Sequence, residues 1–191
     1  MSLVPAFEIG VWNAWIFMIW LLIQNFGIGL INKDLYKKAG HPSDMQQSQI
    51  YKIVSYISMP LWLLVTAYSI FLPLKTGTIF FYVGITIFLL GLIINTGATI
   101  NFGKTPINKP VTRGVYRLSR HPIYLGLLLI YLSVGIASVS WLFLVLTAFS
   151  AILINLSVAD EERYCLNKYG DAYREYMNRT PRWIGILKSG K

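Results

Sequence analysis

The sequence predicts an all-α integral membrane protein with about five transmembrane helices. Of its 191 residues, 55% are hydrophobic and only 13% are charged, whereas a soluble domain carries about 25% charged residues. The apolar residues form long runs between polar stretches, and the mean hydropathy is +0.54. The third observation is that the basic residues gather in alternate polar stretches. A water-soluble core does not need so many large apolar side chains, so the surplus is expected to face lipid.

The first predicted span covers residues 11–31. At about 1.5 Å per residue, this run is long enough to cross roughly 30 Å of hydrocarbon. Trp12, Trp15 and Trp20 lie in its first half, where aromatic side chains anchor a helix at the membrane interface. The preceding residues include Glu8 and lack a basic segment, so we expect a retained helix and not a cleaved signal peptide.

Two more spans complete an N-terminal part of three transmembrane helices, residues 1–100. A polar stretch with a turn at His41-Pro42-Ser43-Asp44 leads to the second span, residues 50–72, in which Pro60 predicts a kink. The third span covers residues 79–100 and ends in polar side chains such as Asn95.

The remaining residues, 101–191, form the predicted catalytic region. It begins with a basic loop, followed by residues 123–156, which contain no charged side chain. We interpret this run as a helical hairpin that reverses near residues 135–140, with arms of about 16 residues, or roughly 24 Å each. The polar segment that follows is expected to be cytoplasmic and helical, with a possible interruption at Gly170, and to form the cofactor site.

The distribution of positive charge predicts the orientation. Five spans place 16 of the 17 Lys and Arg residues on one side and leave Lys75 alone on the other. The positive-inside rule then places the N-terminus outside and the C-terminus in the cytoplasm. Because the net charge of +9 lies beside apolar spans, we expect anionic lipid headgroups as its partners and not nucleic acid. The oligomeric state is left open.

Three polar clusters fall on the cytoplasmic side of this arrangement. They are Arg120-His121-Pro122-Ile123-Tyr124-Leu125-Gly126, Asp160-Glu161-Glu162-Arg163 and Arg179-Thr180-Pro181-Arg182. Closure of the hairpin brings the first two together. Ionisable groups at the end of an apolar hairpin are costly unless they are paired or functional. With one cysteine and two histidines in the chain, neither a disulfide nor a metal site is expected.

The combined spacing of these motifs resembles the isoprenylcysteine carboxyl methyltransferases, and phospholipid N-methyltransferases share much of it. The resemblance rests on the first cluster, the Glu161-Glu162 pair about 30 apolar residues later, and Tyr169-Gly170, Tyr173, Tyr176, Arg179 and Pro181, with Gly114-Val115-Tyr116 upstream. It covers about residues 101–181.

The resemblance implies methyl transfer from S-adenosyl-L-methionine to a lipid-like acceptor, with the α-carboxylate of a prenylated cysteine as the first prediction. The acceptor would enter from the bilayer, and Arg120 or Arg179 would hold its carboxylate. The implied cofactor-binding residues are Asn108, Lys109, Pro110, Val111, Tyr116, His121, Pro122, Ile123, Tyr124, Glu161 and Glu162. The chain departs from the eukaryotic enzymes at Ser157, where those carry a basic residue, and this weakens the prediction of a prenylcysteine acceptor.

Other interpretations remain open at this stage. A phospholipid N-methyltransferase would keep the cofactor and change the acceptor. The stretch that includes Asp160-Glu161, Cys165 and Lys168-Tyr169-Gly170 also resembles sterol reductases, which use NADPH and have more spans. A non-enzymatic lipid-binding protein would use the basic loops for headgroups alone. Within the tail we expect the tyrosines to pack the helix against the bundle.

Overall fold

The computed structural model describes residues 9–31 and 47–185, and the turn expected at residues 41–44 lies outside these ranges. The described elements are helices and short turns, with one isolated β-bridge between Asn13 and Pro73. The helices are α1 (Trp15–Ile31), α3 (Gln49–Ser69), α4 (Ile79–Lys104), the 3₁₀ turn η1 (Gly114–Arg117), α5 (Pro122–Ala137), α6 (Trp141–Tyr169) and α7 (Asp171–Arg179).

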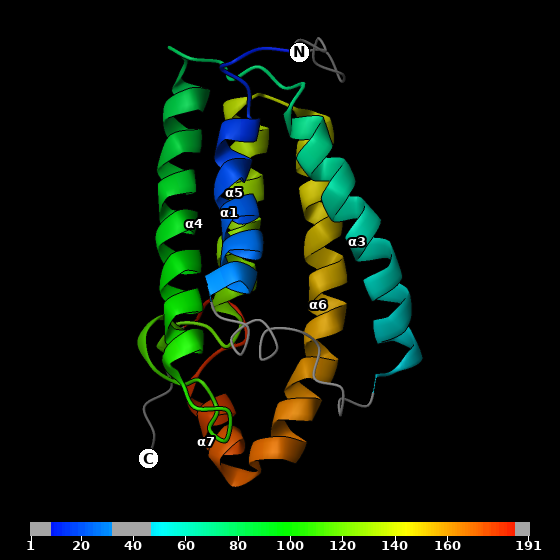
Figure 1. Cartoon of the computed structure of the whole chain (residues 1–191), viewed down its shortest axis with the longest axis vertical. Helices are drawn as coiled ribbons and strands as arrows, with labels where there is room; N and C mark the ends of the chain where they lie inside the picture. Colours follow the sequence, from blue (N-terminus) through cyan, green and yellow to red (C-terminus); the bar gives the residue numbers. More distant parts are fainter. Residues whose placement is uncertain (1–8, 32–46, 186–191) are drawn as a thin grey trace.

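Five helices, α1, α3, α4, α5 and α6, lie side by side and alternate in direction along the chain (Figure 1). Three of them, α3, α4 and α6, are long and apolar enough to cross a membrane, whereas α5 and the Trp15–Gln24 part of α1 are shorter apolar helices. Large hydrophobic side chains are exposed along the outer faces of the long helices, including Ile53, Ile93 and Ile152. An exposed apolar surface of this extent is what contact with lipid requires.

The helices α4 and α5 pack unusually closely because glycines lie where they meet. A Cβ atom on Gly126 would come within 2.6 Å of the Asn95 Cβ, and one on Gly84 would come equally close to Ala137. Small residues allow helix backbones to approach in this way inside membranes. The approach brings Asn95 to α5, where its Nδ2 donates to the carbonyl of Ile123 at 3.0 Å.

The predicted hairpin is present, but its second arm is longer than expected. The first arm, α5, has 16 residues, and the chain reverses at 138–140 through Val139, which has φ 54°. The second arm, α6, has 29 residues and does not end at residue 156. The helix continues through the first polar residues. The side chains of Asp160, Glu161 and Glu162 contact other side chains and leave the helical backbone hydrogen bonds in place. The expected interruption at Gly170 is confirmed, since its φ of 54° separates α6 from α7.

The other span boundaries differ slightly from the prediction. The first helix begins at Trp15 because residues 11–14 form turns, in which Asn13 donates to the carbonyl of Ile70. The third helix continues to Lys104. The start of α3 is held against α6 by hydrogen bonds. The backbone N–H and the hydroxyl of Ser48 both donate to Asp160 Oδ2.

Candidate active site

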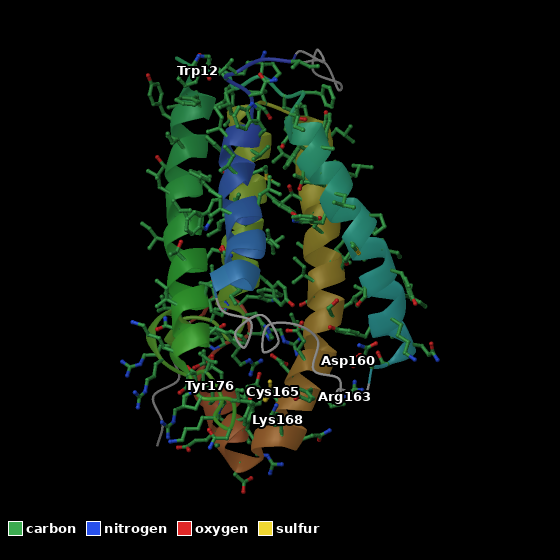
Figure 2. The ribbon with its side chains drawn as sticks, in the orientation of Figure 1. Trp12, Asp160, Arg163, Cys165, Lys168 and Tyr176 are labelled. Atoms are coloured by element: carbon green, nitrogen blue, oxygen red, sulfur yellow. The ribbon has the colours of Figure 1, made fainter. Side chains whose placement is uncertain are left out.

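The polar residues collect at one end of the bundle, around the last turns of α6 and the short helix α7. In Figure 2, Asp160, Arg163, Cys165, Lys168 and Tyr176 lie at this end, and Trp12 lies at the opposite end. The antiparallel hairpin explains the gathering, because the start of α5 and the end of α6 lie at the same end. Pro122 occupies the first turn of α5, where a missing N–H has no consequence.

Glu162 is the centre of a buried ionic cluster. Its side chain is only 4% exposed and is surrounded by three basic groups. His121 Nε2 lies 3.2 Å from Glu162 Oε1, and Arg120 Nε lies 3.0 Å from the same oxygen. Arg182 completes the cluster with Nε 3.2 Å from Oε1 and Nη2 2.5 Å from Oε2. We call Arg120, His121, Glu162 and Arg182 the ionic cluster.

The electrostatics of Glu162 follow from these contacts. The residue lies beyond the apolar, charge-free part of α6, residues 141–159. Burial alone would raise the pKa of its carboxyl group, but hydrogen bonds from His121 and Arg182 and the charge of Arg120 lower that pKa to about 2. Glu162 is therefore ionised at neutral pH and holds three chain segments together.

Glu161 has a different environment. Its Oε1 accepts a hydrogen bond of 2.5 Å from the Tyr124 hydroxyl, and its Oε2 lies 3.8 Å from His121 Nδ1. The side chain of Glu161 is 26% exposed, so its carboxylate can be reached by a ligand, whereas that of Glu162 is enclosed. The two neighbouring glutamates both contact protein groups but differ in exposure: Glu162 is enclosed, whereas Glu161 is partly exposed.

The segment after α7 covers this cluster. The backbone N–H of Arg120 donates to the Pro181 carbonyl at 3.0 Å, and the Ser119 hydroxyl donates to the Arg182 carbonyl at 3.0 Å. The Trp183 ring centroid lies 5.9 Å from that of His121, and its indole N–H donates to Asn155 Oδ1 at 3.1 Å. Asn155 on α6 is therefore hydrogen-bonded to the C-terminal segment.

A second group, apolar and aromatic, packs beside the ionic cluster. Its buried members are Ala98, Tyr116, Tyr173 and Tyr176, with Val111, Ile123 and Cys165 among the residues around it. The Tyr176 hydroxyl donates to the Tyr116 carbonyl at 2.7 Å. The tail tyrosines Tyr173 and Tyr176 thus pack α7 against the bundle, as predicted. Burial raises the pKa of the Cys165 thiol to about 12, so this thiol is un-ionised at neutral pH.

The structure brings together many, but not all, of the residues proposed from the sequence. Those that meet around the ionic cluster and the aromatic group are Val111, Tyr116, Arg120, His121, Pro122, Ile123, Tyr124, Glu161 and Glu162. Asn108 and Lys109 are exposed on the basic loop, with Pro110 partly buried next to them. Arg179 is not brought to the cluster, since it pairs with Glu175 one turn earlier on α7.

The sequence prediction left out two residues that the structure places at the centre. Arg182, and not Arg179, reaches Glu162, and Trp183 lies over His121. Arg182 belonged to the third polar cluster, but its spacing from the Glu pair gave no means of choosing it over Arg179. The choice depends on how the chain leaves α7 at Thr180.

The site is thus an ionic cluster at one end of an apolar helical bundle that has three helices long enough to cross a membrane. A family described as phospholipid methyltransferase matches residues 74–172, and the chain belongs to this family. The match confirms the resemblance to membrane methyltransferases. It includes α4, α5 and α6 and excludes α1, α3, Arg182 and Trp183.

Two individual relatives are each similar to part of the chain. The chain is 33% identical over 86 residues to methanethiol S-methyltransferase 1 of Bradyrhizobium diazoefficiens. The aligned region covers 45% of this chain and 27% of the relative. The chain is also 35% identical over 65 residues to an uncharacterised protein of Haemophilus influenzae. This aligned region covers 32% of this chain and 100% of that relative. The chain thus spans only about a quarter of the methanethiol enzyme.

Proposed function

We propose that this protein transfers a methyl group from S-adenosyl-L-methionine to a lipid-like acceptor at one surface of the membrane. The observation that carries the proposal is the unequal Glu161-Glu162 pair in a chain of the phospholipid methyltransferase family. One carboxylate builds the site, and its neighbour can be reached from outside. The methyl donor would supply an activated methyl group on a sulfonium centre.

The residues present fit such a donor. Its ammonium group and ribose hydroxyls need hydrogen-bond acceptors, and the partly exposed Glu161 carboxylate is one. Its cationic sulfur favours aromatic faces, and the rings of Tyr124 and Trp183 flank His121 at centroid distances of 6.1 and 5.9 Å. Glu161 would hold the cofactor, while His121 and Tyr124 fix the position of Glu161.

In this scheme the ionic cluster positions groups and takes no part in proton transfer. Methyl transfer is an in-line displacement, so catalysis depends strongly on how well the two reactants are aligned. Glu162 joins the start of α5 to the segment after α7 through Arg120, His121 and Arg182. The cofactor residues on α5 and α6 are thereby held at a fixed separation.

The choice of acceptor is narrowed by the arginines. The prenylcysteine carboxylate predicted from sequence would need a cation, but Arg120 and Arg182 are paired with Glu162, and Arg179 with Glu175. A carboxylate held by Arg120, Arg179 or Arg182 would therefore share the guanidinium group with a glutamate. A lipid acceptor without a carboxylate, such as a phospholipid amine, needs no such sharing. Both acceptor classes are consistent with the family. We also propose that the site faces the cytoplasm, as the distribution of positive charge predicts.

Two measurements test the proposal. Calorimetric titration of the purified protein in nanodiscs with S-adenosylhomocysteine should give saturable binding. Transfer of a labelled methyl group should then be followed to a panel of prenylcysteine analogues, phospholipids and neutral lipids. Absence of S-adenosylhomocysteine binding to the folded protein, or saturable binding of NADPH in its place, would refute the proposed function.

A further inference from the structure

A second polar cluster lies inside the bundle, on the uncharged parts of α1 and α4. Among the described residues, the buried side-chain atoms without a hydrogen-bond partner include Trp20 Nε1, Gln24 Oε1 and Asn95 Oδ1. Buried polar groups are normally paired, and leaving one unpaired is unfavourable because the group has lost its hydrogen bonds to water. We call Trp20, Gln24 and Asn95 the interhelical polar cluster.

The three residues lie near the point where a hydrogen bond between Gln24 and Thr99 joins α1 to α4. Gln24 Nε2 donates to the Thr99 hydroxyl, which donates to the carbonyl of Asn95 at 2.9 Å. Both helices run in the same direction (Figure 1), and Trp20 and Asn95 each lie four residues, or about 6 Å, before the hydrogen-bonded residue. Trp20 and Asn95 therefore lie at the same level of the bundle.

The hydrogen bonds of Thr99 and Ile123 determine which side-chain atoms of Gln24 and Asn95 have no hydrogen-bond partner. The Thr99 proton is used on the Asn95 carbonyl, so the hydroxyl can only accept from Gln24, and the amide must turn its nitrogen toward it. Asn95 Nδ2 is held in the same way by the Ile123 carbonyl. Rotating either amide would lose a bond, so two carbonyl oxygens and one indole N–H remain unpaired.

The unpaired atoms describe a complementary ligand. Two acceptors and one donor match a group with two N–H protons and one oxygen, such as a primary amide. No Asp, Glu, Lys or Arg occurs in residues 15–31, 79–103 or 122–137, so a phosphate or carboxylate would be buried there without a counter-ion. The cluster thus favours an uncharged polar group.

We propose that the interhelical polar cluster binds an uncharged, amide-like group of a lipid-like ligand, and that Trp20 and Gln24 help to select that ligand. That the ligand is the methyl acceptor rests on the proposed function. The position of the cluster supports this assignment. Asn95 is hydrogen-bonded to the carbonyl of Ile123, and the next residue, Tyr124, is hydrogen-bonded to Glu161. Trp20 and Gln24 lie outside the family-matched residues 74–172, so this part of the site belongs to the N-terminal helix.

Binding of a defined probe tests the cluster without any assumption about catalysis. In nanodiscs the protein should bind oleamide saturably and bind N,N-dimethyloleamide, which lacks both N–H protons, about tenfold or more weakly. Oleate, with the same chain and a charged end, should also bind weakly. Equal binding of all three lipids would show non-specific partition into the apolar bundle and would overturn the proposal.

Variants separate a ligand site from a purely structural role. Gln24→Leu and Trp20→Phe should each weaken oleamide binding by about threefold to tenfold. The melting temperature should stay the same or rise in Trp20→Phe, which removes an unpaired N–H. It should fall slightly in Gln24→Leu, which also loses the hydrogen bond to Thr99. Trp15→Phe is the matched control, because the Trp15 indole donates to Gly10 O, outside the cluster. Oleamide affinity unchanged in both cluster variants would contradict the proposal.

The two proposals can fail separately. If S-adenosylhomocysteine does not bind but oleamide binding depends on Gln24, the proposed function is wrong and the lipid site stands. If S-adenosylhomocysteine binds and methyl transfer to an acceptor occurs with the same KM in Gln24→Leu as in the unmodified protein, the cluster is not the acceptor site. A raised KM with an unchanged S-adenosylhomocysteine Kd is the expected result.

Discussion

The ionic cluster and the interhelical polar cluster lie on the same helical bundle, but they satisfy their polar groups to different degrees. Glu162 in the ionic cluster contacts three basic side chains at 3.2 Å or less. Asn95 in the interhelical cluster is just as buried, at 1% exposed, and leaves its oxygen unpaired. Every charged group of the ionic cluster lies close to one of opposite charge, although Arg120 Nε, 3.0 Å from Glu162 Oε1, makes no well-aligned hydrogen bond. The buried oxygen of Asn95 has no such ion pair and points to a missing partner. The comparison teaches that burial alone does not distinguish a structural polar group from a binding one.

The largest expected effect comes from neutralising Glu162. Glu162→Gln leaves Arg120 and Arg182 without their anion, and breaking a buried ion pair from one side costs about 3–5 kcal/mol. We expect a large drop in melting temperature, measured by circular dichroism in nanodiscs, and loss of S-adenosylhomocysteine binding. The control is Glu175→Gln, which removes an exposed pair with Arg179 and should cost under about 1 kcal/mol. Equal effects of the two variants would contradict a structural role for the ionic cluster.

Changing the neighbouring glutamate should affect binding and not folding. Glu161→Gln keeps the size of the side chain and an oxygen for the Tyr124 hydroxyl, but removes the accessible negative charge. The melting temperature should change little, and S-adenosylhomocysteine affinity should fall about tenfold or more, because hydrogen bonds to charged groups contribute about 1.5–3 kcal/mol. Calorimetry gives the affinity. A destabilised protein with unchanged affinity would reverse the roles assigned to the two glutamates.

The tight contact between α4 and α5 can be used to disturb Asn95 alone. Gly126→Ala would place a Cβ 2.6 Å from the Asn95 Cβ and 2.8 Å from its backbone nitrogen. Such overpacking costs about 1–3 kcal/mol, so the melting temperature should fall while Glu162 keeps its partners. Gly97→Ala is the control, since its nearest neighbour would be a Val115 methyl at 3.4 Å. If both variants melt alike, the two helices are less closely packed than the structure indicates.

The pH dependence of stability should report the ionic cluster and not the uncharged one. Because the pKa of Glu162 is lowered to about 2 from an ordinary 4.5, its contribution is fully present above about pH 4.5 and is lost as the pH falls toward 2. Melting temperatures between pH 6 and pH 2 should therefore decline, and the decline should be shallower in Glu162→Gln. Gln24→Leu, which removes no titrating group, should follow the curve of the unmodified protein.

The amino-acid sequence by itself determined the apolar helices, the hairpin and the main polar motifs. Hydropathy located these helices because their composition is fixed by the environment that they face, and no charge occurs between Ile123 and Ala159. The spacing of His121 and the Glu pair was sufficient to indicate the family, which the match to residues 74–172 confirms. The break at Gly170 could also be predicted, because glycine tolerates a positive φ.

Only the tertiary structure decided how the polar groups are paired. Glu161 and Glu162 are adjacent and chemically identical, but they project from α6 in different directions. Glu162 therefore contacts Arg120, His121 Nε2 and Arg182, whereas Glu161 contacts Tyr124 and His121 Nδ1. Arg182, and not Arg179, reaches Glu162 because of the direction that the chain takes after α7. The oxygens of Gln24 and Asn95 are unpaired because of the way α1 packs against α4. Pairing is a property of distances between segments far apart in the chain, which local composition does not specify.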